Sequence, residues 1–332
     1  MILLIPVLIG VSLLAFFIMR SAGDPTFSYI QNPDKLTDIQ YNLIREKYHL
    51  NEPTYIQYFY WLDAVLHGDL GYTSADQHKL VTQTLAERFP ATFELALLAT
   101  FFSVIIGIAI GTASAVRANS AFDQASRVIS LIAVSIPVFW LGIMLQILFY
   151  SYLGWLPISG RYELVIHDPT TLSVHTNFLL IDTALSGDFS FFIDALKHIL
   201  LPAITLAFVS TALILRMMRA SMLEVLGAEY VQTARSKGLS EKVVIKKHAR
   251  RNALIPTTTV IGLSFGALLG GAVLTESVFD WQGLGQWSAD AALRLDSGGV
   301  MGFTLLTAMI YVLANLIVDL TYAYLDPRVR LG

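Results

Sequence analysis

Apolar residues along this chain gather into long unbroken runs. Six runs reach or approach the length of about 20 residues that a helix needs to cross the hydrocarbon core of a membrane. They do not alternate every second residue, as the strands of a membrane barrel would, so they predict helices. The fold class expected is an all-α membrane protein whose six spans are residues 2–19, 92–116, 128–153, 199–215, 257–275 and 300–324.

The composition agrees with these runs. Of the 332 residues, 55% are hydrophobic and 14% are charged, against about 45–50% apolar and about 25% charged in soluble domains. A soluble globule is therefore excluded. The chain has no cysteine, which excludes disulfides, thiol nucleophiles and Cys-ligated metals. A formal net charge of −3 excludes a generally basic nucleic-acid binder.

Lysine and arginine in the connections predict the orientation. Basic residues concentrate in cytoplasmic loops, and the connection 216–256 holds nine of them against three acidic residues. It should be cytoplasmic, and by parity so should both termini. The connections 20–91, 154–198 and 276–299 hold nine basic and eighteen acidic residues, so they should face outward. Arg20 on the outer side runs against this pattern, and we expect a basic leader ahead of Met1.

Residues 2–19 have a second interpretation, a secretory signal peptide cleaved at Ser21-Ala22-Gly23. It is disfavoured because the charged n-region is absent and because five remaining spans would leave the two tails on opposite faces. The predicted organisation is a first span (1–19), an extracytoplasmic helical loop (20–91), a core of five spans (92–324) that contains the cytoplasmic loop 216–256, and a cytoplasmic tail (325–332).

The outer loop contains two predicted helices. Thr37 and Gln40 have the spacing of a capping box, which predicts a helix to about Tyr48. Pro53 predicts the start of a second helix, with Gly68 beyond its end. A stripe on this second helix is more typical of core packing or interface anchoring than of a ligand platform; it comprises Tyr58, Trp61, Leu62 and Val65.

Small residues recur every four positions in two spans, and they let helix backbones approach closely in lipid. The fifth span should therefore be central in the bundle. Within it, residues 262–266 match the Gly-x-Ser-x-Gly elbow of serine hydrolases, but that elbow needs a strand and a sharp turn, and Ser264 lies inside an apolar run. The small residues are Gly107, Gly111 and Ala115 in the second span, and Gly262, Gly266 and Gly270 in the fifth.

Polar groups at membrane depth need a partner or water, because a buried charge is costly there. Glu94, near the outer end of the second span, is expected to reach water. Asn315 and Asp319 share one face of the sixth span, at positions i and i+4. A salt bridge from Asp319 to Arg216 or Arg219 is the favoured prediction, and an ion or proton site is the alternative.

The sequence of the predicted cytoplasmic loop indicates helical structure in addition to positive charge. Its charge alone could serve only to enforce topology. Residues 229–237 predict a short helix, Gly238 suits the left-handed turn after it, and Ser240 with Glu241 suits the start of a second helix. Two helices joined by a glycine and lying across the membrane plane make a surface that a second protein could grip.

The loop resembles a known family. Residues 229–241 and 248–256 are similar to the cytoplasmic coupling loop of ABC importer permeases of the dipeptide/oligopeptide/nickel family, B-type subunit. Similar pieces recur over nearly the whole chain, at 23–25, 68–71, 90–95, 275–279, 283–285 and 326–328. Three places depart from the pattern: Gln-Thr-Ala at 232–234 replaces Glu-Ala-Ala, Gln282 replaces a proline, and 297–299 replace an aromatic-proline pair.

The resemblance implies a subunit that forms half of a translocation pathway in the cell membrane and works by alternating access. Its partners would be a homologous second permease subunit, two ABC ATPases, an extracytoplasmic substrate-binding protein and membrane lipid. It implies no cofactor in this chain, with ATP and Mg bound by the ATPases; the sequence agrees, since it has no GxxxxGK[ST] phosphate loop. The implied coupling residues are Glu229, Tyr230, Ala234, Arg235, Lys237, Gly238, Leu239 and Ser240.

Three other functions stay open from the residues alone. A secondary transporter or channel would need intramembrane charges or half-helices, and the spans supply little beyond Asp319. An intramembrane enzyme would need Ser264 with a base, or an HExxH pair, which the sequence lacks. A purely structural membrane subunit is the third. The resemblance implies a peptide as substrate, with an oligosaccharide or a nickel chelate as alternatives.

Overall fold

The computed structural model describes residues 4–30, 37–74, 76 and 79–325, without the side chains of residues 4, 5, 27, 319 and 322–325. Almost all of its elements are helices. The chain divides into two units, which we describe separately. Unit 1 consists of residues 1–93, 164–192 and 270–312, and unit 2 of residues 94–163, 193–269 and 313–332.

Unit 1 holds the outer-loop helices and several short elements. The two predicted helices of residues 20–91 are confirmed as α2 and α3. The capping box forms, with the Gln40 amide donating to Thr37 Oγ1 over 3.4 Å. Its elements are α1 (Leu4–Ala22), η1 (Pro25–Tyr29), α2 (Asp38–Lys47), α3 (Thr54–Leu66), the antiparallel pair β1 (Tyr72–Thr73) and β2 (Lys79–Leu80), η4 (Pro169–Thr171), α7 (Leu179–Leu185), α12 (Val273–Val278) and α13 (Leu284–Leu293).

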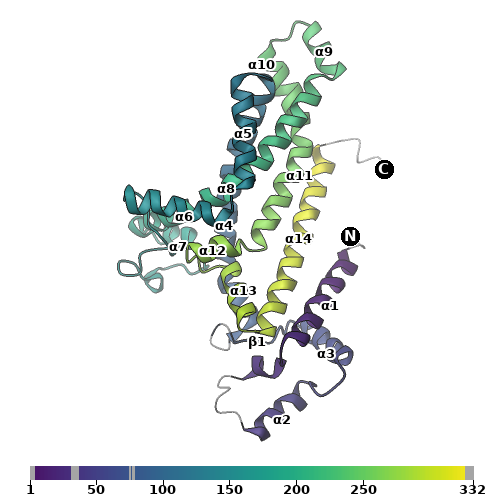
Figure 1. The fold of residues 1–332 in the computed structure, drawn as a ribbon, viewed down its shortest axis with the longest axis vertical. Helices are drawn as coiled ribbons and strands as arrows, with labels where there is room; N and C mark the ends of the chain where they lie inside the picture. The colour runs from purple at the N-terminus through teal and green to yellow at the C-terminus, as the bar shows by residue number, and fades with distance from the viewer. Residues whose placement is uncertain (1–3, 31–36, 75, 77–78, 326–332) are drawn as a thin grey trace. The chain divides into compact units, whose positions relative to one another are not determined.

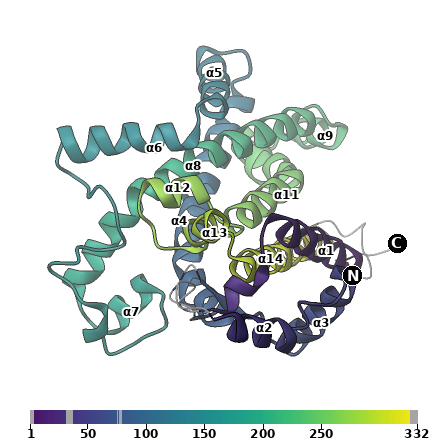
Figure 2. The ribbon, with the colours of Figure 1, turned by 60° about the horizontal axis from the view of Figure 1, so that its bottom comes forward.

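α3 lies beside α1 (Figure 2), and its aromatic stripe packs against α1. Tyr58 is buried, and its ring meets the ring of Phe16 edge-on at a centroid distance of 5.4 Å. Trp61 and Leu62 lie against the same cluster and are partly buried. The stripe therefore contributes to the core of unit 1, as its pattern predicted.

Unit 2 is built from long helices, of which three begin in or extend from unit 1. These three are α4 (Val81–Val116), α8 (Phe189–Leu226) and α14 (Ser297–Leu325). The remaining elements are α5 (Ala121–Ser135), α6 (Val138–Gln146), the π-helical η3 (Ile147–Tyr152), α9 (Glu229–Ser236), α10 (Glu241–Val243), the π-helical η5 (Val244–Ala249) and α11 (Arg250–Leu269).

Four helices in the described ranges are long and apolar enough to cross a membrane. They contain most or all of the second, fourth, fifth and sixth predicted spans. A fifth crossing is counted if α5 and the helix that follows it form one span, and α1 is apolar but shorter in its described part, Pro6–Ala22. A multi-pass helical architecture is thus confirmed, whereas the count of six and the sides of the termini stay predictions.

The predicted continuous helix over residues 128–153 was wrong. The chain bends by 99° between Ala121–Ser135 and Val138–Tyr152. Ile136 there is extended, with φ −78° and ψ 127°. Pro137 explains the break, because proline has no N–H to donate and its ring excludes the residue before it from helical conformation.

The fifth predicted span has different ends from those expected. Its helix stops at Leu269 instead of continuing to residue 275, so Gly270 lies outside it. Gly271 adopts φ +99°, a conformation that ends a helix readily only at glycine. At the other end the helix begins at Glu241, because no glycine or proline interrupts residues 241–255.

Candidate functional site

The segment around Gly238 forms the helix and turn that the sequence predicts. α9 ends with Lys237 as its C-cap, and Gly238 follows at φ +77°. The Gly238 amide donates to the Arg235 carbonyl over 2.9 Å, which closes the turn. Figure 1 shows α9 and α10 at the same end of α8 and α11. We call residues 229–240 the loop helix segment.

The second predicted helix is not a separate piece. α10 runs through the π-helical η5 into α11, so that Glu241–Leu269 forms one long helix. Ser240 stands at the N-cap position, but its side chain makes no capping hydrogen bond. The second helix therefore starts where the sequence predicts, at Ser240 and Glu241, but it is the first part of a membrane-length helix, against which the short helix α9 folds.

The loop helix segment presents most of its predicted coupling residues to solvent. Seven of the eight are exposed, and Ala234 is the exception. Ala234 and Val231 are buried against Val244, which holds one face of α9 to the start of the long helix. Tyr230 and Leu239 leave 45% and 40% of their surface exposed between charged neighbours. Exposed aromatic and aliphatic side chains of this kind are typical of protein contact surfaces.

Two polar contacts tie α9 to the helix beside it. Arg235 and Glu241 form a two-bond fork, with Nη2 to Oε1 at 2.8 Å and Nε to Oε2 at 3.2 Å. Both side chains are well exposed, so the pair adds little stability and chiefly fixes geometry. On α11, Asn252 Nδ2 donates to the Tyr230 hydroxyl over 2.9 Å. α9 is therefore bonded to the long helix at two places.

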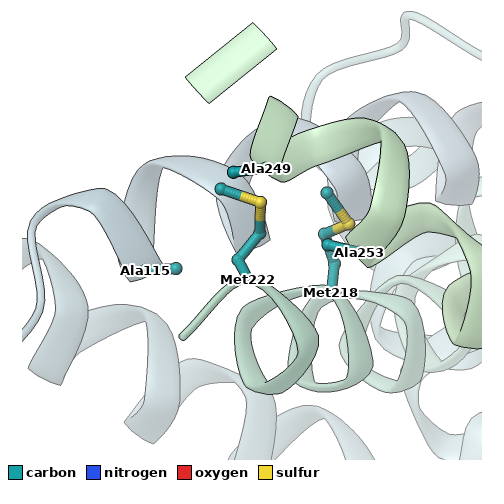
Figure 3. Packing of buried hydrophobic residues seen from close by; sticks show 5 residues of the cluster. All are labelled: Ala115, Met218, Met222, Ala249 and Ala253. Atoms are coloured by element: carbon teal, nitrogen blue, oxygen red, sulfur yellow. The ribbon is translucent and has the colours of Figure 1, made fainter. Parts of the chain in front are cut away.

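A cluster of small and flexible side chains is buried between α4, α8 and the long helix 241–269. Met218 and Met222 of α8 are fully buried. Figure 3 shows the two methionine side chains extending toward Ala249 and Ala253. Ala115, the small residue near the end of α4, completes the cluster. The cluster joins α4, α8 and the long helix 241–269 through alanines that permit close approach.

A buried ion pair lies beside this cluster. Asp123 has no exposed surface, and it accepts hydrogen bonds from Arg219 Nε at 2.5 Å and Arg219 Nη2 at 2.8 Å. Ser114 Oγ donates to it at 2.5 Å, and the Asn119 amide at 3.0 Å. The ends of α4, α5 and α8 are thus fastened at one carboxylate.

Among the described side chains, Arg219 has Asp123 as its ion-pair partner. The Asp319 side chain lies outside the described residues, so the bridge from Asp319 to Arg216 or Arg219 stays a prediction, and Asn315 is half-buried on α14. The sequence did not predict a role for Asp123, because it lies in a short connection between two predicted spans. A carboxylate in such a connection is expected to be hydrated and to need no partner in the protein. The usable signal was its position three residues after Ser120, an N-cap spacing that the structure uses.

Glu94 is buried, and the prediction that it reaches water was wrong. Its side chain keeps 7% of its surface exposed, and Arg161 Nη2 donates to its Oε2 at 2.8 Å. The two residues are 67 positions apart in the sequence, so no local sequence pattern predicts that they pair. Burial of the carboxylate is balanced by a charged donor, as a buried charge requires.

Some glycines of the two predicted stripes lie where helices pack closely, and others do not. A Cβ built on Gly107 would lie 2.8 Å from the Ile214 side chain, and one on Gly262 would overlap Val318. Gly266 is buried in α11, whereas Gly270 follows the end of that helix. Ser264 is helical, so the strand and turn of a nucleophile elbow are absent at this position.

Gly111 allows a test of this packing. A Cβ there would lie 2.8 Å from the Leu215 carbonyl oxygen and from Met218 Cβ. We expect Gly111→Ala to lower the free energy of unfolding by about 1–3 kcal/mol through overpacking. Gly10, with nothing within 4 Å of its built Cβ, is the control: Gly10→Ala should leave stability unchanged or raise it. Thermal unfolding of both purified variants decides, and equal midpoints would contradict the close contact.

The family-like pieces 275–279 and 283–285 meet in unit 1 around a buried carboxyl. Glu276 has no exposed surface; Thr92 Oγ1 donates to it at 2.9 Å and the Gln286 amide at 3.0 Å. The carboxyl therefore caps the first turn of α13. A Cβ on Gly283 would lie 2.6 Å from the same carboxyl, which explains why only glycine fits there.

Burial raises the pKa of Glu276 above its usual range, although the Gln286 amide and Thr92 oppose the shift. Folding then favours the protonated acid, so its contribution to stability declines as the pH rises from the unfolded to the folded pKa. We expect Glu276→Gln, which cannot ionise, to lose less stability than the wild type over the pH range just above the usual pKa of a glutamic acid. Unfolding midpoints measured across this range test it; parallel curves would contradict it.

These features define a class of protein: a multi-pass helical membrane protein with an exposed loop helix that ends at a glycine. Among the described residues, no group of three or more His, Asp or Glu side chains could hold a metal ion. The family model described as "Binding-protein-dependent transport system inner membrane component" matches residues 103–331. The chain belongs to this family of membrane permeases.

Relatives of nearly equal length agree. The dipeptide transport system permease protein DppB of Escherichia coli (strain K12) is 42% identical over 331 residues, which cover 99% of this chain and 96% of the relative. The di/tripeptide permease DppB of Pseudomonas aeruginosa (strain UCBPP-PA14) is 42% identical over 332 residues, covering 99% and 96%. The oligopeptide permease AppB of Bacillus subtilis (strain 168) is 36% identical over 327 residues, covering 98% and 96%. The predicted resemblance to peptide importer permeases is confirmed.

Proposed function

We propose that this chain is one of two permease subunits in an ATP-driven importer for peptides, and that the loop helix segment docks into a cleft on a cytoplasmic ATPase. The observation that carries the proposal is the exposed helix and turn at 229–240, fixed to the start of a membrane-length helix. The names of the relatives support the peptide class of substrate. An oligosaccharide or nickel chelate is the substrate alternative.

The contacts around α9 suggest a route by which a movement of the ATPases would reach the helices of the translocation pathway. The ATPases bind ATP and Mg, and their closure would move α9. Arg235 and the Asn252–Tyr230 hydrogen bond pass this movement to the long helix 241–269. Met218 and Met222 pass it to α8 and α4 through the buried cluster. Rotation of packed helices about such contacts is a known route to alternating access.

The other partners follow from this arrangement. A homologous permease subunit would supply the second half of the pathway, and an extracytoplasmic binding protein would deliver the substrate. The family description, which names transport that depends on a binding protein, supports this assignment over a secondary transporter or channel. The helical position of Ser264 disfavours an intramembrane hydrolase.

Single-cysteine crosslinking tests the docking, since the chain has no cysteine of its own. Leu239→Cys places a thiol on the loop helix segment, and Leu66→Cys places one at the end of α3, which is 77% exposed. In native membranes we expect a short thiol-reactive crosslinker to join position 239 to a protein that carries a phosphate-loop motif. Position 66 should give no such product.

The same two variants test the orientation. An impermeant maleimide should label position 66 in intact cells and position 239 only in inverted vesicles. Labelling of position 239 from outside the cell would contradict the docking proposal, as would a failure to crosslink any ATPase.

A further inference from the structure

Unit 1 contains a cavity of about 160 Å³ that the transport proposal does not use. Residues of α1, η1, α3, β1, the end of α2 and the start of α14 line it, together with the connections between α2 and α3 and between α3 and β1. Its lining includes the basic side chains Arg20 and Lys47 and the imidazole of His49, against one carboxylate, Asp69. The balance of charge therefore favours an anion.

Two lining residues have buried polar atoms without a hydrogen-bond partner in the described part of the chain. They are Nε and Nη1 of Arg20 and Oε1 of Gln57. Gln57 is 9% exposed, and its Nε2 donates to the carbonyls of Leu50 at 3.1 Å and Glu52 at 2.7 Å. These two acceptors fix which way the amide faces, so the free atom is the oxygen. Buried groups left in this state are costly unless a ligand or water completes them.

Asp24 is near enough to favour the charged form of Arg20, but among the described residues the ion pair of Asp24 is with Arg45 and not with Arg20. Asp24 accepts from Arg45 Nη1 at 3.2 Å and from the hydroxyl of Tyr41 at 2.5 Å. Arg20 instead lies over the ring of Phe16, at 4.8 Å from its centroid. Its guanidinium therefore keeps donors for an external acceptor.

The surroundings of the cavity place it where an apolar surface ends. Leu14 and Ile18 of α1 are 67% and 61% exposed, and Arg20 lies less than one turn beyond Ile18. On α3, Tyr55 and Phe59 are 61% and 65% exposed. An apolar helix that ends in arginine beside exposed aromatic rings is typical of the headgroup level of a bilayer.

We propose that this cavity binds a phosphate oxyanion, as carried by a phospholipid headgroup at the end of α1. Arg20 donates to the phosphate oxygens, a pairing for which the guanidinium is well suited. Gln57 Oε1 accepts from a hydroxyl or ammonium of the headgroup. A bound anion also accounts for an arginine at the start of a connection whose acidic residues outnumber its basic ones.

Ligand-induced thermal stabilisation of the full chain tests the site. The chain is purified in a phosphate-free maltoside detergent and titrated with dihexanoyl phosphatidylglycerol, with inorganic phosphate, and with dihexanoyl glycerol as the phosphate-free probe. We expect saturable stabilisation by the phospholipid and none by dihexanoyl glycerol. Arg20→Gln should weaken the apparent affinity by about tenfold or more, the loss expected for a hydrogen bond to a charged group.

Matched variants separate binding from folding. Arg20→Lys keeps the charge but not the planar fork, so its affinity should be intermediate. Arg294→Gln removes an exposed arginine of the same unit that does not line the cavity, and it should bind as the wild type does. Equal stabilisation by inorganic phosphate would assign the site to a soluble anion. Wild-type affinity in Arg20→Gln, or equal stabilisation by dihexanoyl glycerol, would overturn the proposal.

Discussion

Valine at position 238 should abolish coupled transport while leaving the chain in the membrane. Gly238 has φ +77°, and a β-branched residue adopts that conformation only at a cost of about 1–3 kcal/mol. Nothing lies within 4 Å of a Cβ built there, so the damage is to the backbone turn and not to packing. The turn after α9 would rearrange and displace the exposed surface that we propose to dock.

The measurement uses the complete complex in proteoliposomes. For Gly238→Val we expect dipeptide uptake to fall by tenfold or more, with ATP hydrolysis retained and no longer stimulated by substrate. Gly238→Asn should keep much of the uptake, because asparagine tolerates the left-handed conformation better than other side chains do.

Gly68 provides a control with the same local chemistry. It has φ +85° at the end of α3 and nothing within 4 Å of its built Cβ. Gly68→Val therefore introduces similar backbone strain at a residue of unit 1 that is not part of the loop helix segment. Uptake should be affected much less than in Gly238→Val. Equal loss in both variants would indicate general destabilisation, and normal uptake in Gly238→Val would refute the coupling role.

Local signals in the sequence predicted the local structure well. The capping box of Thr37, the start of α3 after Pro53 and the glycine end of α9 each depend on a few adjacent residues. Apolar runs of membrane length likewise predicted most of the long helices. These features can be predicted from the sequence because a capping hydrogen bond joins residues within one helical turn, and the preference of an apolar run for the membrane depends only on the residues of that run.

Partners distant in sequence could not be predicted from spacing. Glu94 finds Arg161, and Asp123 finds Arg219, only because the helices that carry them pack together. The break at Pro137 was predictable in principle, since the proline was visible. It was overlooked because hydropathy alone cannot distinguish a straight span from a bent one. The role of Glu276 as a cap on α13 could not be predicted either, because its contacts with Thr92 and Gln286 form only when the chain is folded.

Removal of Asp123 should be among the most damaging single changes in unit 2. Asp123→Ala leaves the guanidinium of Arg219 without its carboxylate and removes one of the two side-chain partners of Ser114. Breaking a buried charged pair costs about 3–5 kcal/mol. Arg219 keeps 18% of its surface exposed, which lets water moderate the loss, so we expect a decrease of about 2–4 kcal/mol in the free energy of unfolding.

A double-mutant cycle separates the pair from its individual residues. Arg219→Met alone should also destabilise the chain, because it leaves the buried carboxylate unpaired, whereas the Asp123→Ala/Arg219→Met double variant should recover part of the loss. Arg127, 3.9 Å from Asp123 and half exposed, is the control, and Arg127→Gln should change the unfolding midpoint little. Since the pair fastens α4 and α5 to the helix that leads into the loop helix segment, the single variants should also reduce substrate-stimulated ATP hydrolysis. Strictly additive unfolding energies in the cycle would show that the two side chains do not interact.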